Sequence, residues 1–349
     1  MKTELVVFGI IAAFVVAGAF LVNIPQGQLS LPNLGKAPEF SGISGYINTE
    51  PGLTLESLRG KVVLVDFWTY SCINCIRTLP YLNAWHEKYK DQGLVIVGVH
   101  TPEFAFEREY GNVKAAVEKY GIEYAVVQDN DYATWNAYDN KYWPRKYLVD
   151  AQGNIRYDHI GEGAYEETEA AIQALLKERD ASLDVSGMVK PNATEVNFTQ
   201  VLTPELYFGY QFARQPLGSP EAFKPEETVN YSIPDNISPN AIYLEGSWKN
   251  NEDNMELVSQ DGRILLAYYA RAVNIVAGSG VGNELEIKLD GDYVDAGSKG
   301  SDIAIEGGRS ISTIDSHRLY NLVFSNSYDA HMVEIKAGQG FRIYTFTFG

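Results

Sequence analysis

The segment from Val62 to Cys75 reads VVLVDFWTYSCINC and is the strongest indicator of the fold. Its first half is a run of β-branched and aromatic residues, which predicts a buried strand over residues 61–68. A helical pattern begins at Cys72 and continues to Tyr89. The chain has only 2 cysteines, and both lie at this junction of strand and helix. Two thiols spaced in this way can close a reversible disulfide.

The two cysteines are expected to differ in reactivity. At the start of a helix, Cys72 faces unpaired backbone N–H groups, which stabilise a thiolate and lower its pKa below the free value of about 8.5. Cys75, one turn later, is expected to be buried and protonated until it resolves a mixed disulfide formed at Cys72. Asp66 stands among apolar strand residues, where burial would raise its pKa and let it relay a proton through water. The alternative is that Asp66 faces solvent at a strand end.

A third element of this candidate site is Pro144, which follows Trp143 and precedes the strand predicted over residues 146–150. An aromatic residue before proline raises the cis population. A cis bond would leave the Trp143 backbone free to pair with an extended substrate, whereas a trans proline at a strand start is the alternative. Trp68 and Tyr70 are expected to shape an apolar surface beside the dithiol.

The chain as a whole divides into two units of different character. Between residues 41 and 180 strands and helices alternate, which predicts an α/β unit with a mixed sheet covered by helices on both faces. The expected strands are 61–68, 94–100, 124–128, 146–150 and 154–161, and the expected helices are 72–89, 105–120 and 165–177. A polar linker is expected over residues 181–196. From 197 to 349 short alternating runs predict an all-β sandwich, with strands at 241–246, 263–269, 272–277, 285–289, 319–324, 332–335 and 341–348.

The amino-terminal end carries an apolar segment. Residues 5–22 contain no charged side chain, so residues 1–23 are expected to be a membrane anchor or a signal peptide, followed by a linker over 24–40. Either role places the rest on the extracytoplasmic side, anchored or secreted. The formal charge of −17 argues against nucleic-acid binding, because little basic surface is available to neutralise phosphates.

The motifs resemble the thioredoxin superfamily. Asp66-Phe67-Trp68 before the Cys-x-x-Cys, and Pro80 inside the following helix, match its pattern, and an extra helix between residues 94 and 128 is similar to the TlpA-like branch. Residues 67–75, 77–80 and 142–145 resemble the soluble portion of DipZ-type proteins. In that family a thioredoxin-like domain precedes a jelly roll similar to carbohydrate-binding modules, which residues 203–205, 209–210, 289–291 and 346–349 resemble.

This resemblance implies a thiol–disulfide oxidoreductase that acts on protein disulfides through a redox-active Cys72–Cys75 pair, without a metal or diffusible cofactor. DipZ-type proteins carry a multi-helix membrane electron carrier before these domains, whereas this sequence has one hydrophobic segment. A separate CcdA-like or DsbD-like membrane partner is therefore expected to supply electrons. Ile73-Asn74 replaces the Gly-Pro that thioredoxin has between its cysteines. The reduction potential of the Cys72–Cys75 pair is therefore not expected to equal that of thioredoxin.

Three other functions are alternatives to thiol–disulfide exchange. Structural zinc needs four ligands, and no second cysteine pair is present. Thr69 and Cys72 satisfy half of a peroxiredoxin-like motif, so a thiol peroxidase is an alternative. The β unit could instead bind a glycan or a protein partner, with Trp248, Tyr268 and Tyr269 as candidates for stacking on sugars, although aromatic residues in a sandwich more often belong to the core.

Overall fold

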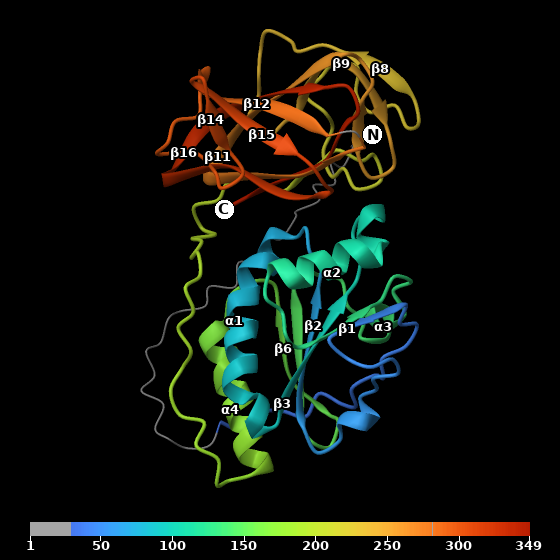
Figure 1. The fold of residues 1–349 in the computed structure, drawn as a ribbon, viewed down its shortest axis with the longest axis vertical. Coiled ribbons are helices and arrows are strands. Elements are labelled where there is room, and N and C mark those ends of the chain that lie inside the picture. Colours follow the sequence, from blue (N-terminus) through green and yellow to red (C-terminus); the bar gives the residue numbers. More distant parts are fainter. Residues whose placement is uncertain (1–28, 281) are drawn as a thin grey trace, which may run out of the picture.

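The computed structural model describes residues 29–280 and 282–349, which form an α/β unit and a β-rich unit stacked along the long axis of the molecule (Figure 1). The expected apolar segment over residues 5–22 lies outside the described residues. Within the part of the chain that is described, no helix combines the length and the apolar character needed to cross a membrane.

The α/β unit is built on a six-stranded sheet with the order β1-β4-β3-β2-β5-β6. Strand β2 lies in its middle, parallel to β3 and antiparallel to β5. The strands are β1 Gly45–Ile47, β2 Val62–Trp68, β3 Leu94–His100, β4 Ala125–Gln128, β5 Arg145–Val149 and β6 Ile155–Ile160. The helices are α1 Ile73–Tyr89, α2 Tyr110–Lys119, α3 Ala133–Ala137 and α4 Tyr165–Arg179, with short 3₁₀ turns η1 Glu56–Leu58, η2 Lys90–Gln92 and η3 Ala105–Arg108.

Successive residues of β2 point to opposite faces of this sheet. Leu64 and Trp68 pack in the core that α1, α2 and α4 cover. Val65 and Phe67 pack on the other face, which is covered by the short helix α3 and by loops. Asp66 shares the face of Leu64 and Trp68, so it points toward the helical layer that includes α1.

Some elements differ from the sequence prediction. Strand β1 and helix α3 were not expected, because three and five residues are too short to show a period. The helix predicted over residues 105–120 is broken into η3 and α2, since Glu109 has an extended backbone. The linker predicted over 24–40 is in part structured: Leu34 donates a backbone hydrogen bond to Ile155, and Phe40 lies in the core.

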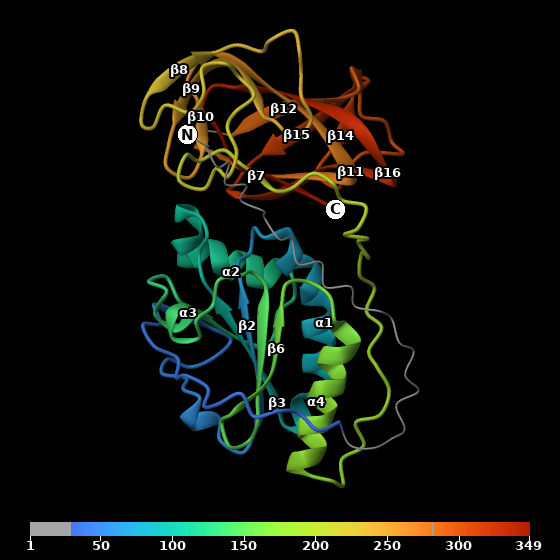
Figure 2. The same cartoon turned by 180° about the vertical axis from the view of Figure 1, so that it is seen from behind.

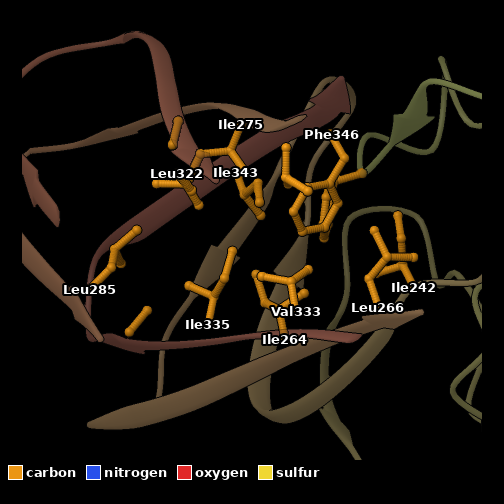
Figure 3. Packing of buried hydrophobic residues seen from close by; sticks show 14 of the residues in the cluster. Ile242, Ile264, Leu266, Ile275, Leu285, Leu322, Val333, Ile335, Ile343 and Phe346 are labelled. Atoms are coloured by element: carbon orange, nitrogen blue, oxygen red, sulfur yellow. The ribbon is translucent and has the colours of Figure 1, made fainter. Parts of the chain in front are cut away.

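The β-rich unit is an 11-stranded antiparallel sheet with the main path β14-β15-β12-β16-β11-β17-β10-β9-β8, joined by β7 and β13. The strands are β7 Leu206–Tyr207, β8 Thr228–Tyr231, β9 Tyr243–Asn250, β10 Met255–Leu257, β11 Asp261–Ser279, β12 Asn283–Leu289, β13 Asp292–Tyr293, β14 Ala304–Glu306, β15 Arg309–Ile314, β16 Arg318–Gly338 and β17 Phe341–Phe348. Aliphatic and aromatic side chains such as Ile275, Leu322, Ile335 and Phe346 fill its core (Figure 3).

The expectation of short strands is wrong for β11 and β16. The sequence predicts two short strands at 263–269 and 272–277, but the structure has the single long strand β11 there. It also predicts two short strands at 319–324 and 332–335, where the structure has the single long strand β16. Their pairing skips at Arg271, where Ala270 pairs with Asp329 but Ala272 pairs with Phe324. At this register shift residues 325–328 of β16 face Arg271 of β11, and neither strand ends there.

The two units touch at the amino-terminal end of α1 (Figure 2). Phe104, in the segment between β3 and η3, packs with Tyr207 and Tyr344 of the β-rich unit. Ile73 and Ile76 of α1 border the same cluster. The β-rich unit is therefore placed directly beside the segment that carries the cysteines.

Candidate redox site

Cys72 is the N-cap of α1, and its Sγ accepts a hydrogen bond from the Cys75 backbone N–H over 3.4 Å. The strand β2 ends four residues earlier, so the chain turns from the sheet into the helix at the first thiol. Both cysteines are free thiols; Cys72 is half-buried and Cys75 is buried. Burial, followed by the interaction with Cys72, raises the pKa of Cys75 well above its ordinary value. The pair thus combines an accessible sulfur with an enclosed, protonated one.

Asp66 is buried beneath the dithiol, and burial raises its pKa to about 7. Lys146, its register partner on β5, lowers that pKa but does not cancel the effect of burial. The negative charge of Asp66 also contributes to raising the pKa of Cys75, so the two groups interact electrostatically. Asp66 Oδ1 has no hydrogen-bond partner among the described residues. A carboxyl group that titrates near neutral pH can accept and return a proton under physiological conditions.

The Trp143–Pro144 peptide bond is cis, and the Cys72 thiol lies 4.0 Å from the Trp143 carbonyl oxygen, toward which it can donate. The indole of Trp143 is held in place by its Nε1, which donates to the Thr101 carbonyl over 3.1 Å, and by the ring of Trp135 at 4.2 Å. The backbone before Pro144 is therefore fixed beside the first sulfur.

Trp68 and Tyr70 do not form the surface that was expected of them. Trp68 has no exposed area, and Tyr70 is only 4% exposed. Tyr70 stacks on His100 at 5.7 Å, and its hydroxyl donates to the His317 carbonyl of the β-rich unit over 3.3 Å. The sequence could not show that a second unit closes over this tyrosine.

Two charged residues at the site were missed by sequence reasoning. One is Lys146, the buried cation opposite Asp66. The other is Glu107, which accepts hydrogen bonds from the Ser71 hydroxyl at 2.5 Å and from the Phe104 N–H at 3.0 Å. Burial raises the pKa of Glu107. Glu107 stabilises the turn before Cys72. Its role could not be predicted from the sequence, because it depends on the contact with Ser71 in the folded chain.

The peroxidase alternative depends on Thr69. Its Oγ1 lies 3.4 Å from His100 Nε2 in the buried layer beneath the site. The Thr69 carbonyl accepts a hydrogen bond from the Cys72 N–H, so this residue shapes the turn through its backbone. Within the described residues, no group of three or more His, Cys, Asp or Glu side chains is arranged to hold a metal ion.

The predicted sugar contacts are wrong for Trp248 and Tyr268. Trp248 has no exposed area, and its Nε1 donates to the Glu245 carbonyl over 3.0 Å. Tyr268 is 2% exposed and packs against Phe348. Both rings belong to the hydrophobic core of the β-rich unit. Tyr269, on the opposite face of β11, is half-buried.

Two family profiles match the chain: the AhpC/TSA family over residues 35–158 and the thioredoxin-like C-terminal domain over residues 203–349. The thiol–disulfide oxidoreductase YkuV of Bacillus subtilis is 31% identical over 144 residues, covering 41% of this chain and 95% of YkuV. The chain belongs to the thioredoxin-like thiol–disulfide oxidoreductases.

Among these relatives, Protein DipZ of Mycobacterium bovis matches both units. It is 36% identical over 334 residues, covering 95% of this chain but only 45% of DipZ, so the chain spans less than half of that relative's length. A solved structure, the thioredoxin domain of a thiol–disulfide oxidoreductase from Bacteroides vulgatus, is 28% identical with a TM-score of 0.35, covering 41% of this chain and 99% of its own. The chain is therefore similar to DipZ over both of its units.

Proposed function

We propose that this enzyme exchanges electrons between its Cys72–Cys75 dithiol and disulfides of substrate proteins on the extracytoplasmic side of a membrane. The observation that carries the proposal is the position of Cys72 Sγ, which lies at the start of α1 between the Cys75 N–H and the Trp143 carbonyl. A substrate strand that pairs with the backbone before cis-Pro144 would bring its disulfide to this sulfur.

In the reducing direction, the Cys72 thiolate attacks one sulfur of the substrate disulfide, and the other substrate sulfur leaves as a thiolate. Asp66 then takes the proton of Cys75 through a water molecule, and the Cys75 thiolate attacks Cys72. The second substrate thiol is released, and two electrons have passed from the enzyme to the substrate. Thiols alone carry this chemistry, so the proposal includes no metal or diffusible cofactor.

Regeneration of the dithiol needs a reductant. We assign this role to a separate membrane electron carrier of the CcdA or DsbD type. The apolar segment over residues 5–22 would tether the enzyme close to such a donor. The β-rich unit, antiparallel between its named strands, is proposed to be a jelly roll similar to carbohydrate-binding modules.

Insulin reduction tests the proposed exchange. Cys72→Ser is expected to lower the rate to the uncatalysed background, because the attacking sulfur is lost. Cys75→Ser is expected to trap the mixed disulfide with insulin, which a non-reducing gel would show as a covalent adduct. A Cys72→Ser protein that reduces insulin at the rate of the unmodified enzyme would rule out the mechanism.

A further inference from the structure

A cavity of about 310 Å³ lies between the two units, next to the dithiol helix. Ile73 and Ile76 of α1 contribute one wall, and Ala272 and Leu319 of the β-rich unit contribute the other. Ile73 directly follows Cys72, so the residue next to the attacking cysteine lines the cavity. Its volume is near the lower end for ligand pockets, which suits a side chain better than a large ligand.

The charged residues of this cavity are mostly basic. Arg77, Lys119 and Arg271 line it together with a single acidic residue, Asp302. Asp302 is already engaged, because it accepts a hydrogen bond from Arg318 at 2.7 Å and one from the Asn321 N–H at 2.8 Å. The whole chain has 28 basic and 45 acidic residues, so the charged side chains that line the cavity have the opposite balance.

Two of these cations, Lys119 and Arg271, form no salt bridge with another described residue. Among the described residues Lys119 makes neither a salt bridge nor a hydrogen bond through its Nζ, which lies 5.4 Å from the centre of the Tyr120 ring. Arg271 donates to the Glu195 carbonyl, and its buried Nε has no hydrogen-bond partner within the described chain. Arg77, in contrast, is paired with Glu162 at 2.8 Å.

Cationic side chains that line a partly closed cavity without an anionic partner are unfavourable unless a ligand supplies one. The ring of Phe324, 5.1 Å from the Arg271 guanidinium, helps to keep that group in place. A carboxylate is the acceptor that matches arginine and lysine in charge and geometry. The apolar wall of Ile73 and Ile76 can cover the methylene groups that carry it.

We propose that this cavity receives an acidic side chain of the substrate protein, close to the cysteine that Cys72 attacks. The inference rests on the proposed function, because the mixed disulfide at Cys72 is what brings the neighbouring residues of the substrate to the cavity. The β-rich unit thereby takes part in substrate choice, since it supplies Arg271 and the opposite wall. Acidic residues near the target disulfide become the preferred substrate class.

The test uses synthetic peptides that each contain one intramolecular disulfide and differ by Glu or Gln at single positions within three residues of either cysteine. The second-order rate constant for reduction by the full, prereduced enzyme is measured at low salt. At the position that reaches the cavity, the Glu peptide is expected to react about tenfold faster than the Gln peptide, the gain typical of a hydrogen bond to a charged group. The preference should shrink as salt is added.

Variants identify the cavity as the source of that preference. Lys119→Gln and Arg271→Gln are each expected to lower the Glu-to-Gln rate ratio, and the double variant is expected to bring it near one. Lys119→Arg should retain the ratio, because it keeps the charge. Lys114→Gln is the matched control, since this exposed lysine of α2 pairs with Glu118 at 4.0 Å, and it should leave both rates unchanged.

The outcomes separate this inference from the proposed function. If the enzyme reduces insulin and the Gln peptides but shows no Glu preference at any position, the cavity proposal is overturned and the exchange activity stands. A Glu preference that survives in the double variant also overturns the cavity proposal, because residues other than Lys119 and Arg271 then recognise the acidic side chain. If insulin and all peptides remain oxidised, the proposed function itself fails.

Discussion

At the scale of single residues, Asp66 and Lys146 are register partners that are both buried beneath the dithiol. The sequence predicts the burial of Asp66, since its neighbours on β2 are apolar. It could not predict Lys146 as the partner, because the register between β2 and β5 joins residues 80 positions apart and is set by the whole sheet. Burial raises the pKa of Asp66 to about 7 although Lys146 lowers it, and a proton acceptor for Cys75 is most useful in this range.

Replacing Asp66 by Asn should therefore slow resolution of the mixed disulfide by about 100-fold at neutral pH, the usual contribution of a general base. In the unmodified enzyme the rate of resolution should rise as pH increases through about 7, because deprotonated Asp66 is the active form. The Asp66→Asn variant should show no such rise in its rate of resolution across this pH range. Stopped-flow decay of a preformed mixed disulfide measures it, with Asp91→Asn on the exposed turn η2 as control. Identical profiles for enzyme and variant would exclude Asp66 as the base.

At the scale of elements, local pattern predicts the α/β unit better than the β-rich unit. The apolar runs predict the first and last residues of β2 and β3 to within one residue. In β16, residues 324–330 are mostly exposed and polar, so the sequence resembles a loop although the backbone remains extended. Pairing with β11 resumes on both sides of residues 325–328, through Phe324 and through Asp329, so the strand continues across them. This pairing is long-range, so a local sequence pattern does not predict it.

The segment before η3 joins the units through Phe104, which is 2% exposed. Its ring lies 5.1 Å from Tyr344 and 5.8 Å from Phe212. Phe104→Ala is expected to lower the free energy of unfolding by about 3–5 kcal/mol, because it opens a cavity in the shared core. Ile305→Ala on β14 is the control, since Ile305 is 44% exposed and should cost less than about 0.5 kcal/mol. Equal losses in urea denaturation would show that Phe104 does not hold the units together.

At the scale of the whole molecule, the contact between the units could not be predicted, since Tyr70, Phe104 and Glu103 look locally like ordinary strand-end and loop residues. Glu103 accepts a hydrogen bond from the Tyr207 hydroxyl at 2.8 Å, and Glu205 lies 3.2 Å from the same hydroxyl. One hydroxyl proton can serve only one of these carboxylates. Burial, then the charges of Glu107 and Glu205, raise the pKa of Glu103 to about 8.

The junction between the units should therefore weaken as pH rises. Between the ordinary pKa of 4.5 and the folded value of about 8, folded Glu103 keeps a proton that the unfolded chain has released. Its contribution to stability is complete below pH 4.5 and is lost as pH increases toward 8. Glu103→Gln should make the decline of the unfolding free energy shallower by up to about 1.4 kcal/mol per pH unit in this window, the effect of one proton. Urea denaturation at pH 5, 6, 7 and 8 measures the slope of the unfolding free energy against pH. Glu109→Gln is the control, because Glu109 is exposed. If Glu103→Gln and Glu109→Gln give the same slope, Glu103 holds no extra proton at the junction.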